Sequence, residues 1–204
     1  MEKHEEMTIA EYQLTAEQYR TGTLDHDVSQ NRNALINAMP KNPGKILDVG
    51  CGPGRDLLAF KKAGHTVIGL DATPAFVAMA KEYSGCEVWH QSFFNLNLPP
   101  ATFDGIFANA SLIHVPRFSM IKVLQDLRAS LVDKGIIVMS MCRGNGEGYS
   151  VRPTGYRYVA GWEYETLASC VEQAGLKILE HYYRPSGLPR ESQNWLVMVA
   201  CKVS

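Results

Sequence analysis

The alternation of short apolar runs with helical patterns, from about residue 45 onward, restricts the fold of this chain more than any other feature. Runs such as "KILDV" (45–49), "TVIGLD" (66–71) and "GIIVMSM" (135–141) are separated by segments long enough for a helix. Strands joined in this way form right-handed βαβ crossovers. The pattern therefore predicts a parallel sheet with helices on both of its faces.

The end of the chain follows a different pattern. The apolar runs "LKILEHYY" (176–183) and "NWLVMVACK" (194–202) are joined by a stretch rich in turn residues, which predicts an antiparallel pair. The fold class that we expect is α/β, with a Rossmann-like doubly wound sheet of seven strands, mostly parallel with an antiparallel C-terminal hairpin. The other expected elements are strands at 86–91 and 103–110, and helices near 55–63, 74–84, 117–131 and 162–174.

Length and composition favour one domain. A chain of 204 residues can bury a sizeable core by itself, and we expect residues 45–204 to form that core and residues 1–44 to form an extension. The formal net charge of -1 makes a nucleic acid partner unexpected. The five cysteines are scattered without a C-x-x-C pair, so we expect neither disulfides nor a metal site. The sequence shows no signal peptide and no membrane span, which predicts a cytoplasmic protein.

The stretch "ILDVGCGPGRD" (46–56) places Gly50, Gly52 and Gly54 directly after the first apolar run. Glycines at the carboxyl end of a strand let a ligand approach the backbone closely. The spacing G-x-G-x-G differs from the G-x-G-x-x-G of dinucleotide sites, and the lysine of a P-loop is missing. Asp71 ends the second run, at roughly the 20-residue offset from which a carboxylate binds ribose hydroxyls. The sequence thus predicts a nucleotide-like ligand.

With its acidic residue before the turn, Asp48, this constellation resembles the S-adenosylmethionine site of class I methyltransferases, from about residue 44 to the end. The resemblance implies that S-adenosylmethionine is the cofactor, with no metal. The glycines and Arg55 are then expected around the methionine part, and Asp71 at the ribose. The adenine is expected at Ala72, and at Ser92 and Phe93 where related proteins often carry an acidic residue. Asn109 is expected near the sulfonium.

Two further stretches, "GTLDHDVSQN" (22–31) and "HYYRPSGLPRESQNWL" (181–196), resemble the methyltransferase domain that ends the fused ovothiol-biosynthesis synthases. In that family the domain methylates a ring nitrogen of 5-thiohistidine. The resemblance implies the same acceptor here. Because no sulfoxide synthase region is present, we expect a functional link to a separate enzyme of that kind. The N-terminal segment through Asn31 is predicted to be a lid over the site.

An amino-acid acceptor needs a guanidinium for its carboxylate and an acidic partner for its ammonium. Candidates for the first are Arg143, Arg152, Arg157, Arg184 and Arg190, and for the second Asp25 or Asp27. His114, Tyr19 and Asp27 are the candidate catalytic residues, and Asn31, Tyr182 and Tyr183 are further substrate-binding candidates. His26 and His114 could instead hydrogen-bond within loops, and Tyr12, Tyr19, Tyr182 and Tyr183 could be core or rim aromatics.

Two alternatives remain for the function. The acceptor could be another small thiol, amine or carboxylic acid, or the chain could bind the cofactor without turnover.

Overall fold

The computed structural model describes residues 3–203, and its main feature is one sheet with the strand order β3-β2-β1-β4-β5-β9-β8. Strands β1 to β5 are parallel, whereas β9 runs antiparallel to both β5 and β8. The predicted fold class is confirmed, and β9 lies inside the sheet rather than at its edge. The strands are β1 (Lys45–Val49), β2 (Thr66–Asp71), β3 (Glu87–His90), β4 (Phe103–Asn109), β5 (Leu131–Cys142), β8 (Leu176–Arg184) and β9 (Trp195–Lys202).

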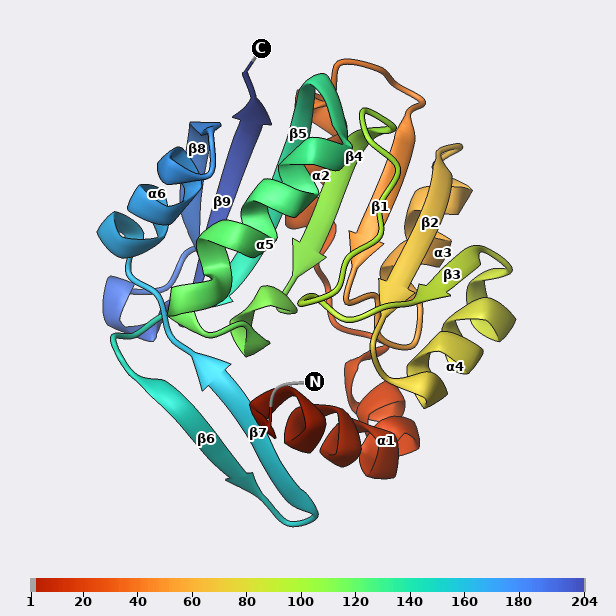
Figure 1. Cartoon of the computed structure of the whole chain (residues 1–204), viewed down its shortest axis with the longest axis vertical. Coiled ribbons are helices and arrows are strands. Elements are labelled where there is room, and N and C mark those ends of the chain that lie inside the picture. Colours follow the sequence, from red (N-terminus) through yellow and green to blue (C-terminus); the bar gives the residue numbers. More distant parts are fainter. Residues whose placement is uncertain (1–2, 204) are drawn as a thin grey trace.

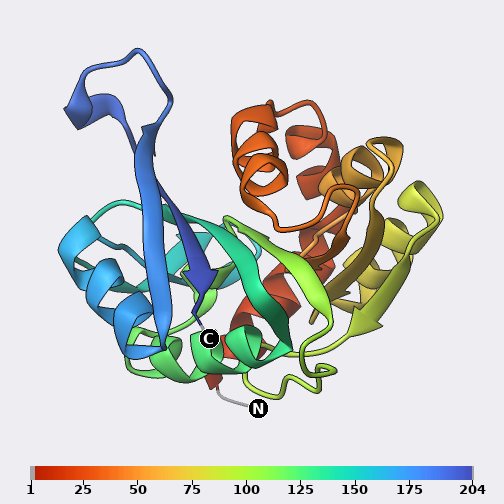
Figure 2. The ribbon, with the colours of Figure 1, turned by 90° about the horizontal axis from the view of Figure 1, so that it is seen from above.

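Helices cover both faces of this sheet (Figures 1 and 2). On one face a buried cluster contains Leu35, Phe60 and Val77, and on the other face a second cluster contains Leu124 and Leu167. The central strands are buried from both sides, which explains why they read as near-continuous apolar runs. The first face carries α2 (Ser29–Ala38), α3 (Arg55–Lys62) and α4 (Pro74–Ser84), and the second carries α5 (Arg117–Ser130) and α6 (Tyr164–Gln173).

Two elements were not expected from the sequence. The long helix α1 (Lys3–Thr23) has a buried side made largely of Glu5, Thr8 and Glu11, so it shows no apolar stripe. The hairpin of β6 (Glu147–Arg152) and β7 (Gly155–Ala160) forms a separate two-stranded sheet and leaves Tyr149, Val151 and Tyr156 exposed. Two short 3-10 helices complete the structure, η1 (Leu112–His114) and η2 (Arg190–Ser192).

Helix α1 lies beside β7, at the edge of the sheet where the parallel strands end (Figure 1). Polar contacts join the two elements. Glu11 forms an ion pair with Arg157 and accepts a hydrogen bond from the Thr154 hydroxyl at 2.8 Å. The Thr8 hydroxyl accepts one from the Tyr158 amide at 2.9 Å. Helix α1 and the hairpin therefore cover the edge of the sheet at which open α/β sheets bind their ligands.

None of the helices within residues 3–203 is both long and apolar enough to cross a membrane.

Candidate active site

The turn after β1 depends on its glycines. Gly50 has a φ of +70°, and a Cβ there would lie 2.4 Å from the Cβ of Ser111. Gly54 has a φ of +92°, and its Cβ would lie 2.9 Å from the Cα of Ala80 on α4. At Gly52 a Cβ would meet nothing closer than Tyr19, at 3.8 Å, because this residue faces a cavity. The turn thus brings bare backbone to the cavity wall.

Asp71 ends β2 with a buried carboxylate. One oxygen accepts a hydrogen bond from the Gly52 amide at 3.0 Å and the other accepts one from the Thr73 amide at 2.8 Å. Burial raises the pKa of Asp71, and these backbone hydrogen bonds oppose the rise. Each oxygen retains a lone pair, and the residue lines the cavity, so Asp71 can accept hydrogen bonds from a pair of ribose hydroxyls.

The turns after β1, β2, β3 and β4 enclose this cavity, and α1 closes it from above. We name it the cofactor cavity. Its volume is about 90 Å³. The two carboxylates of Glu5 and Asp71 are its charged groups, and it contains no Lys or Arg. Its lining residues are Glu5, Thr8, Ile9, Tyr12, Tyr19, Gly50, Gly52, Asp71, Ala72, Thr73, Phe76, Phe93, Phe94, Asn109, Ala110, Ser111 and His114.

Four residues expected at the cofactor lie apart from this cavity, and one of them, Arg55, lines the neighbouring cavity instead. Asp48 is buried, and one of its oxygens has no hydrogen-bond partner among residues 3–203. Burial and the neighbouring Asp56 carboxylate raise the pKa of Asp48. Gly54 directly precedes α3 as its N-cap and lies against α4. Ser92 does not line the cavity. Its hydroxyl donates a hydrogen bond to the carboxylate of Glu5, and Glu5 does line the cavity.

A second, larger cavity of about 500 Å³ adjoins the first, and we name it the acceptor cavity. The two share Tyr12, Tyr19, Asn109, Ala110 and His114. Four arginines and a single carboxylate line the acceptor cavity, so its wall carries an excess of positive charge. Its other lining residues are Thr23, His26, Asp27, Val28, Arg55, Ile113, Ser140, Arg152, Arg157, Val159, Arg184, Pro185 and Trp195.

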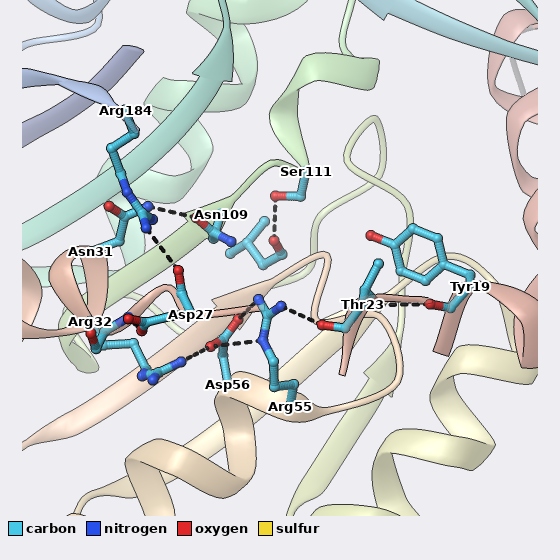
Figure 3. A network of polar contacts seen from close by, with 12 residues as sticks. Tyr19, Thr23, Asp27, Asn31, Arg32, Arg55, Asp56, Asn109, Ser111 and Arg184 are labelled. Carbon is cyan, nitrogen blue, oxygen red and sulfur yellow. Dashed lines mark hydrogen bonds and ion pairs between the residues drawn. The ribbon is translucent and has the colours of Figure 1, made fainter. Parts of the chain in front are cut away.

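The four arginines differ in how far they are already paired. Arg55 forms a 2.6 Å ion pair with Asp56 and donates to the Thr23 carbonyl at 2.9 Å (Figure 3). Arg157 pairs with Glu11 and lies over the Tyr12 ring, 3.8 Å from its centroid. These two arginines hold the site together and have little capacity left for a ligand.

The remaining two arginines are available to an anion. Arg184 donates through one nitrogen to the Asp27 carbonyl at 2.8 Å, while its buried Nε has no hydrogen-bond partner among the described residues (Figure 3). Arg152 is exposed at the cavity wall. The Asp27 carboxylate accepts a hydrogen bond from the Ser29 amide at 2.8 Å, which lowers the pKa of Asp27 and keeps it charged.

A tyrosine and a histidine meet where the two cavities join. The Tyr12 hydroxyl lies 3.0 Å from Nε2 of His114, and Nδ1 of His114 lies 2.6 Å from the Tyr158 carbonyl. A carbonyl can only accept, so Nδ1 carries the proton and Nε2 accepts from Tyr12. Burial lowers the pKa of His114 to about 4. His114 is therefore a neutral base near pH 7.

Tyr19 lies beside this pair. Its ring packs edge-on against Tyr12, with centroids 5.3 Å apart. Burial raises the pKa of Tyr19, so its hydroxyl stays protonated. No described residue accepts a hydrogen bond from that hydroxyl. Tyr19 can thus donate to a ligand, as expected for a site residue, whereas Tyr12 was expected only as a core or rim aromatic.

A chain of hydrogen bonds fixes the side chain of Asn109 at the junction of the cavities. The Tyr182 hydroxyl donates to Asn31 at 2.9 Å, and Asn31 donates to Asn109 at 2.8 Å, as Figure 3 shows for the last two residues. Asn31 is buried, and neither it nor Tyr182 lines a cavity. Both were expected to bind the substrate, and in the structure they position Asn109 instead.

The structure does not bring Arg143, Arg190 or Tyr183 to either cavity. Arg143 donates to the carbonyls of Arg190 and Gln193, and both guanidinium groups lie over the Tyr183 ring. For Tyr183 the reason is the alternation of side chains along a strand, because Tyr182 and Tyr183 on β8 point to opposite faces of the sheet. Asp25 also lies outside the lining, in contrast to Asp27.

Within residues 3–203 no group of three or more His, Cys, Asp or Glu side chains could hold a metal ion, and the cysteines there are free thiols.

Residues 46–135 match a family model described as a methyltransferase domain. The chain is 31% identical over 133 residues to trans-aconitate 2-methyltransferase of Rhodopseudomonas palustris, covering 62% of this chain and 49% of that protein. It is 26% identical over 142 residues to the 18S rRNA (guanine-N(7))-methyltransferase bud23 of Schizosaccharomyces pombe, covering 62% and 52%. The chain thus spans about half the length of these curated relatives.

Among solved structures, the chain is similar to 1,6-didemethyltoxoflavin-N1-methyltransferase of Burkholderia thailandensis, which was crystallised with 1,6-didemethyltoxoflavin and S-adenosylhomocysteine. The TM-score is 0.74 at 21% identity, covering 100% of this chain and 92% of that one. The fold and the cofactor cavity define a class, the class I S-adenosylmethionine-dependent methyltransferases. The chain contains a methyltransferase domain of this class, matched over residues 46–135.

The residues of the cofactor cavity fit S-adenosylmethionine. The buried Asp71 carboxylate suits its ribose, Phe76, Phe93 and Phe94 offer aromatic walls, and the absence of Lys and Arg from the lining suits a positively charged sulfonium. Bound there, the cofactor supplies an electrophilic methyl group.

Proposed function

We propose that this chain methylates a ring nitrogen of 5-thiohistidine with S-adenosylmethionine, which gives ovothiol. The observation that carries the proposal is the pairing of Arg184 and Asp27 in the wall of the acceptor cavity. An amino acid needs a guanidinium for its carboxylate and a carboxylate for its ammonium. The buried and unpaired Nε of Arg184 offers the first and Asp27 offers the second.

Sequence supports the same acceptor. The stretch 22–31 that resembles the ovothiol synthases contributes Thr23, His26, Asp27 and Val28 to the cavity, and the stretch 181–196 contributes Arg184, Pro185 and Trp195. The two most distinctive parts of the resemblance therefore supply walls of one pocket, although they are far apart along the chain.

The chemistry of the junction suits a neutral nitrogen nucleophile. The ring nitrogen attacks the methyl carbon with its lone pair, the carbon–sulfur bond breaks, and the electrons of that bond stay on sulfur. The methylated ring then releases a proton. Neutral His114, reached through the Tyr12 hydroxyl, is the base at the junction of the cavities. Positioning by Asn109 and Tyr19 contributes more than base strength, because the nucleophile is already uncharged.

A second candidate is a small polycarboxylate that accepts the methyl group on a carboxylate oxygen. The excess of arginine over aspartate in the acceptor cavity favours this candidate. Similarity to the trans-aconitate 2-methyltransferase of Rhodopseudomonas palustris adds to it. Such an acceptor needs no base, and it would leave Asp27 without a role.

We also propose that the acceptor comes from a separate sulfoxide synthase in the cytoplasm and that neither nucleic acid nor membrane is a partner. The available guanidinium groups line a cavity sized for a small molecule, which supports this view.

The test incubates purified protein and S-adenosylmethionine with 5-thiohistidine, histidine or trans-aconitate in parallel. Mass spectrometry and nuclear magnetic resonance identify the product. We expect one methyl group on a ring nitrogen of 5-thiohistidine and almost none on histidine, since a site that pairs with the sulfur discriminates by roughly 10⁴-fold. Methylation on sulfur, or preference for the tricarboxylate, refutes the assignment and leaves a methyltransferase for a different acceptor.

Arg184→Gln provides a second readout. Losing a charge-assisted contact should raise the KM for 5-thiohistidine roughly tenfold with little change in the KM for S-adenosylmethionine. Arg190→Gln, in the short helix η2 that follows β8 and outside both cavities, is the matched control and should behave like the wild type. Equal effects of the two substitutions would contradict the role of Arg184.

A further inference from the structure

Glu5 on α1 is a buried carboxylate that the cofactor cavity was not expected to contain. It is 7% exposed and lines that cavity. One of its carboxylate oxygens contacts the Ser92 hydroxyl, and no other hydrogen bond or ion pair to this carboxylate exists among the described residues. Its neighbours in the wall include Ile9, Phe93 and Phe94, which are apolar. A carboxylate in such surroundings needs a further donor, and the wall provides none.

The place of Glu5 in the cavity shows which part of the cofactor it would meet. Asp71 marks the ribose, and the reacting end lies at the junction with the acceptor cavity, beside His114 and Asn109. The nucleobase must extend from the ribose in the other direction, past the end of β2 and toward the turn after β3. That direction leads to Ala72, Phe93 and the Glu5 carboxylate.

We propose that Glu5 accepts a hydrogen bond from the exocyclic amine of the adenine and so selects an adenosyl cofactor. The inference rests on the cofactor site described above. Ser92 holds one oxygen of Glu5, and the other oxygen is left for the amine. The acidic group that the turn after β3 lacks is thus supplied by α1, from the other end of the chain.

This assignment couples recognition of the base to the position of α1. Glu5 reaches the cavity only while α1 lies against the turn that carries Ser92. A bound adenine adds a contact that exists only in this arrangement. Cofactor binding should therefore shift α1 toward its docked position, because a ligand shifts an equilibrium by its differential affinity for the two states.

The experiment compares S-adenosylhomocysteine with S-inosylhomocysteine by titration calorimetry. The inosyl analogue carries a carbonyl where adenine carries its amine, so it presents an acceptor to the carboxylate. Wild-type protein should prefer the adenosyl ligand by about 100-fold or more. Glu5→Gln offers an amide that can donate to the carbonyl, and the preference should fall to about tenfold or less. Glu6→Gln, on the exposed side of the same helix, is the matched control and should keep the wild-type ratio.

Glu5→Asp is the second variant in case Glu5→Gln does not fold, since it keeps the charge and withdraws the carboxylate by one methylene. It should weaken the adenosyl ligand about tenfold and leave the inosyl ligand nearly unchanged. An unchanged ratio in both Glu5 variants, or an equal change in Glu6→Gln, overturns the proposal. If wild-type protein fails to bind S-adenosylhomocysteine at all, the cofactor assignment itself fails, and this proposal with it.

Discussion

The cofactor cavity and the acceptor cavity share a wall but carry opposite charge. The first contains the carboxylates of Glu5 and Asp71 without a cationic side chain, whereas the second contains four arginines and the single carboxylate of Asp27. A sulfonium is stabilised near carboxylates and an anionic acceptor near guanidinium groups. Neutral His114 and Tyr12 lie between the two regions and favour neither charge.

The two cavities also differ in the structural elements that form their walls. The cofactor cavity is lined mainly by turns that directly follow parallel strands, together with five residues of α1. The acceptor cavity depends on long side chains from α1, the β6–β7 hairpin and the end of β8. The cofactor cavity thus depends mainly on the strand ends, with α1 as its cover, whereas the acceptor cavity depends mainly on elements added around them.

Removing α1 should have the largest effect, because this helix belongs to both regions. Deletion of residues 1–26 takes away Glu5, Tyr12 and Tyr19, so turnover should fall by at least about 100-fold while the sheet still folds. Cofactor should still bind, though more weakly. Activity assays and circular dichroism measure the two outcomes. Full activity of the shortened chain would show that α1 is not a lid.

A substitution at Asp71 tests the cofactor cavity alone, because this residue does not line the acceptor cavity. Asp71→Ala should weaken binding of S-adenosylhomocysteine by on the order of 1.5–3 kcal/mol, a factor of roughly 10–100, because two hydrogen bonds to a carboxylate are lost. Asp133→Ala, at an exposed carboxylate on β5, is the control. Calorimetry decides the question, and unchanged affinity in Asp71→Ala would place the ribose elsewhere.

The lowered pKa of His114, at the junction of the two cavities, should make the free energy of unfolding depend on pH. Its folded pKa of about 4 lies below the ordinary value near 6.5, so the unfolded chain binds more protons between these limits. The contribution is complete above pH 6.5 and is lost as pH falls toward 4, by about 3 kcal/mol. His114→Gln should remove this dependence in urea titrations. The exposed His181, changed to Gln, should leave it intact.

Breaking the chain of hydrogen bonds from Tyr182 through Asn31 to Asn109 should give the smallest effect. Tyr182→Phe removes the hydroxyl that holds Asn31, and we expect a loss of about 1 kcal/mol in stability and a fall in kcat of about threefold. The KM for S-adenosylmethionine should not change. Tyr183→Phe, one residue further along β8, is the control in both measurements. A larger effect from the control would contradict the chain of contacts through Asn31.

The sequence predicted the cofactor side better than the acceptor side, and the reason is locality. Asp71 and Gly52 follow apolar runs directly, so a strand pattern is enough to bring them to one edge. Glu5 and Tyr12 required α1, whose buried face is polar and carries no apolar stripe. A signal was present nonetheless, since Glu5, Tyr12 and Tyr19 recur at spacings that place them on one side of a helix.

Side-chain direction limited the rest of the prediction. Arg143, Arg184 and Arg190 were equivalent candidates in the sequence. Only the structure distinguishes them, because Arg184 at the end of β8 contacts Asp27, whereas Arg143 contacts the carbonyl of Arg190. Tyr182 and Tyr183 differ in the same way, by the alternation of one strand. The β6–β7 hairpin escaped prediction because most residues of β6 are exposed and only two residues of β7 are fully buried, so neither strand forms an apolar run.

The position of β9 has a consequence for synthesis of the chain. Within residues 3–203 this strand is the last in sequence order, yet it pairs along nearly its whole length with β5 on one side and β8 on the other. Until residues 195–202 leave the ribosome, β5 presents an open edge with unpaired backbone groups, and β8 has no neighbour. Such edges attract other strands. We therefore expect the nascent chain to be most prone to aggregation before β9 inserts between β5 and β8.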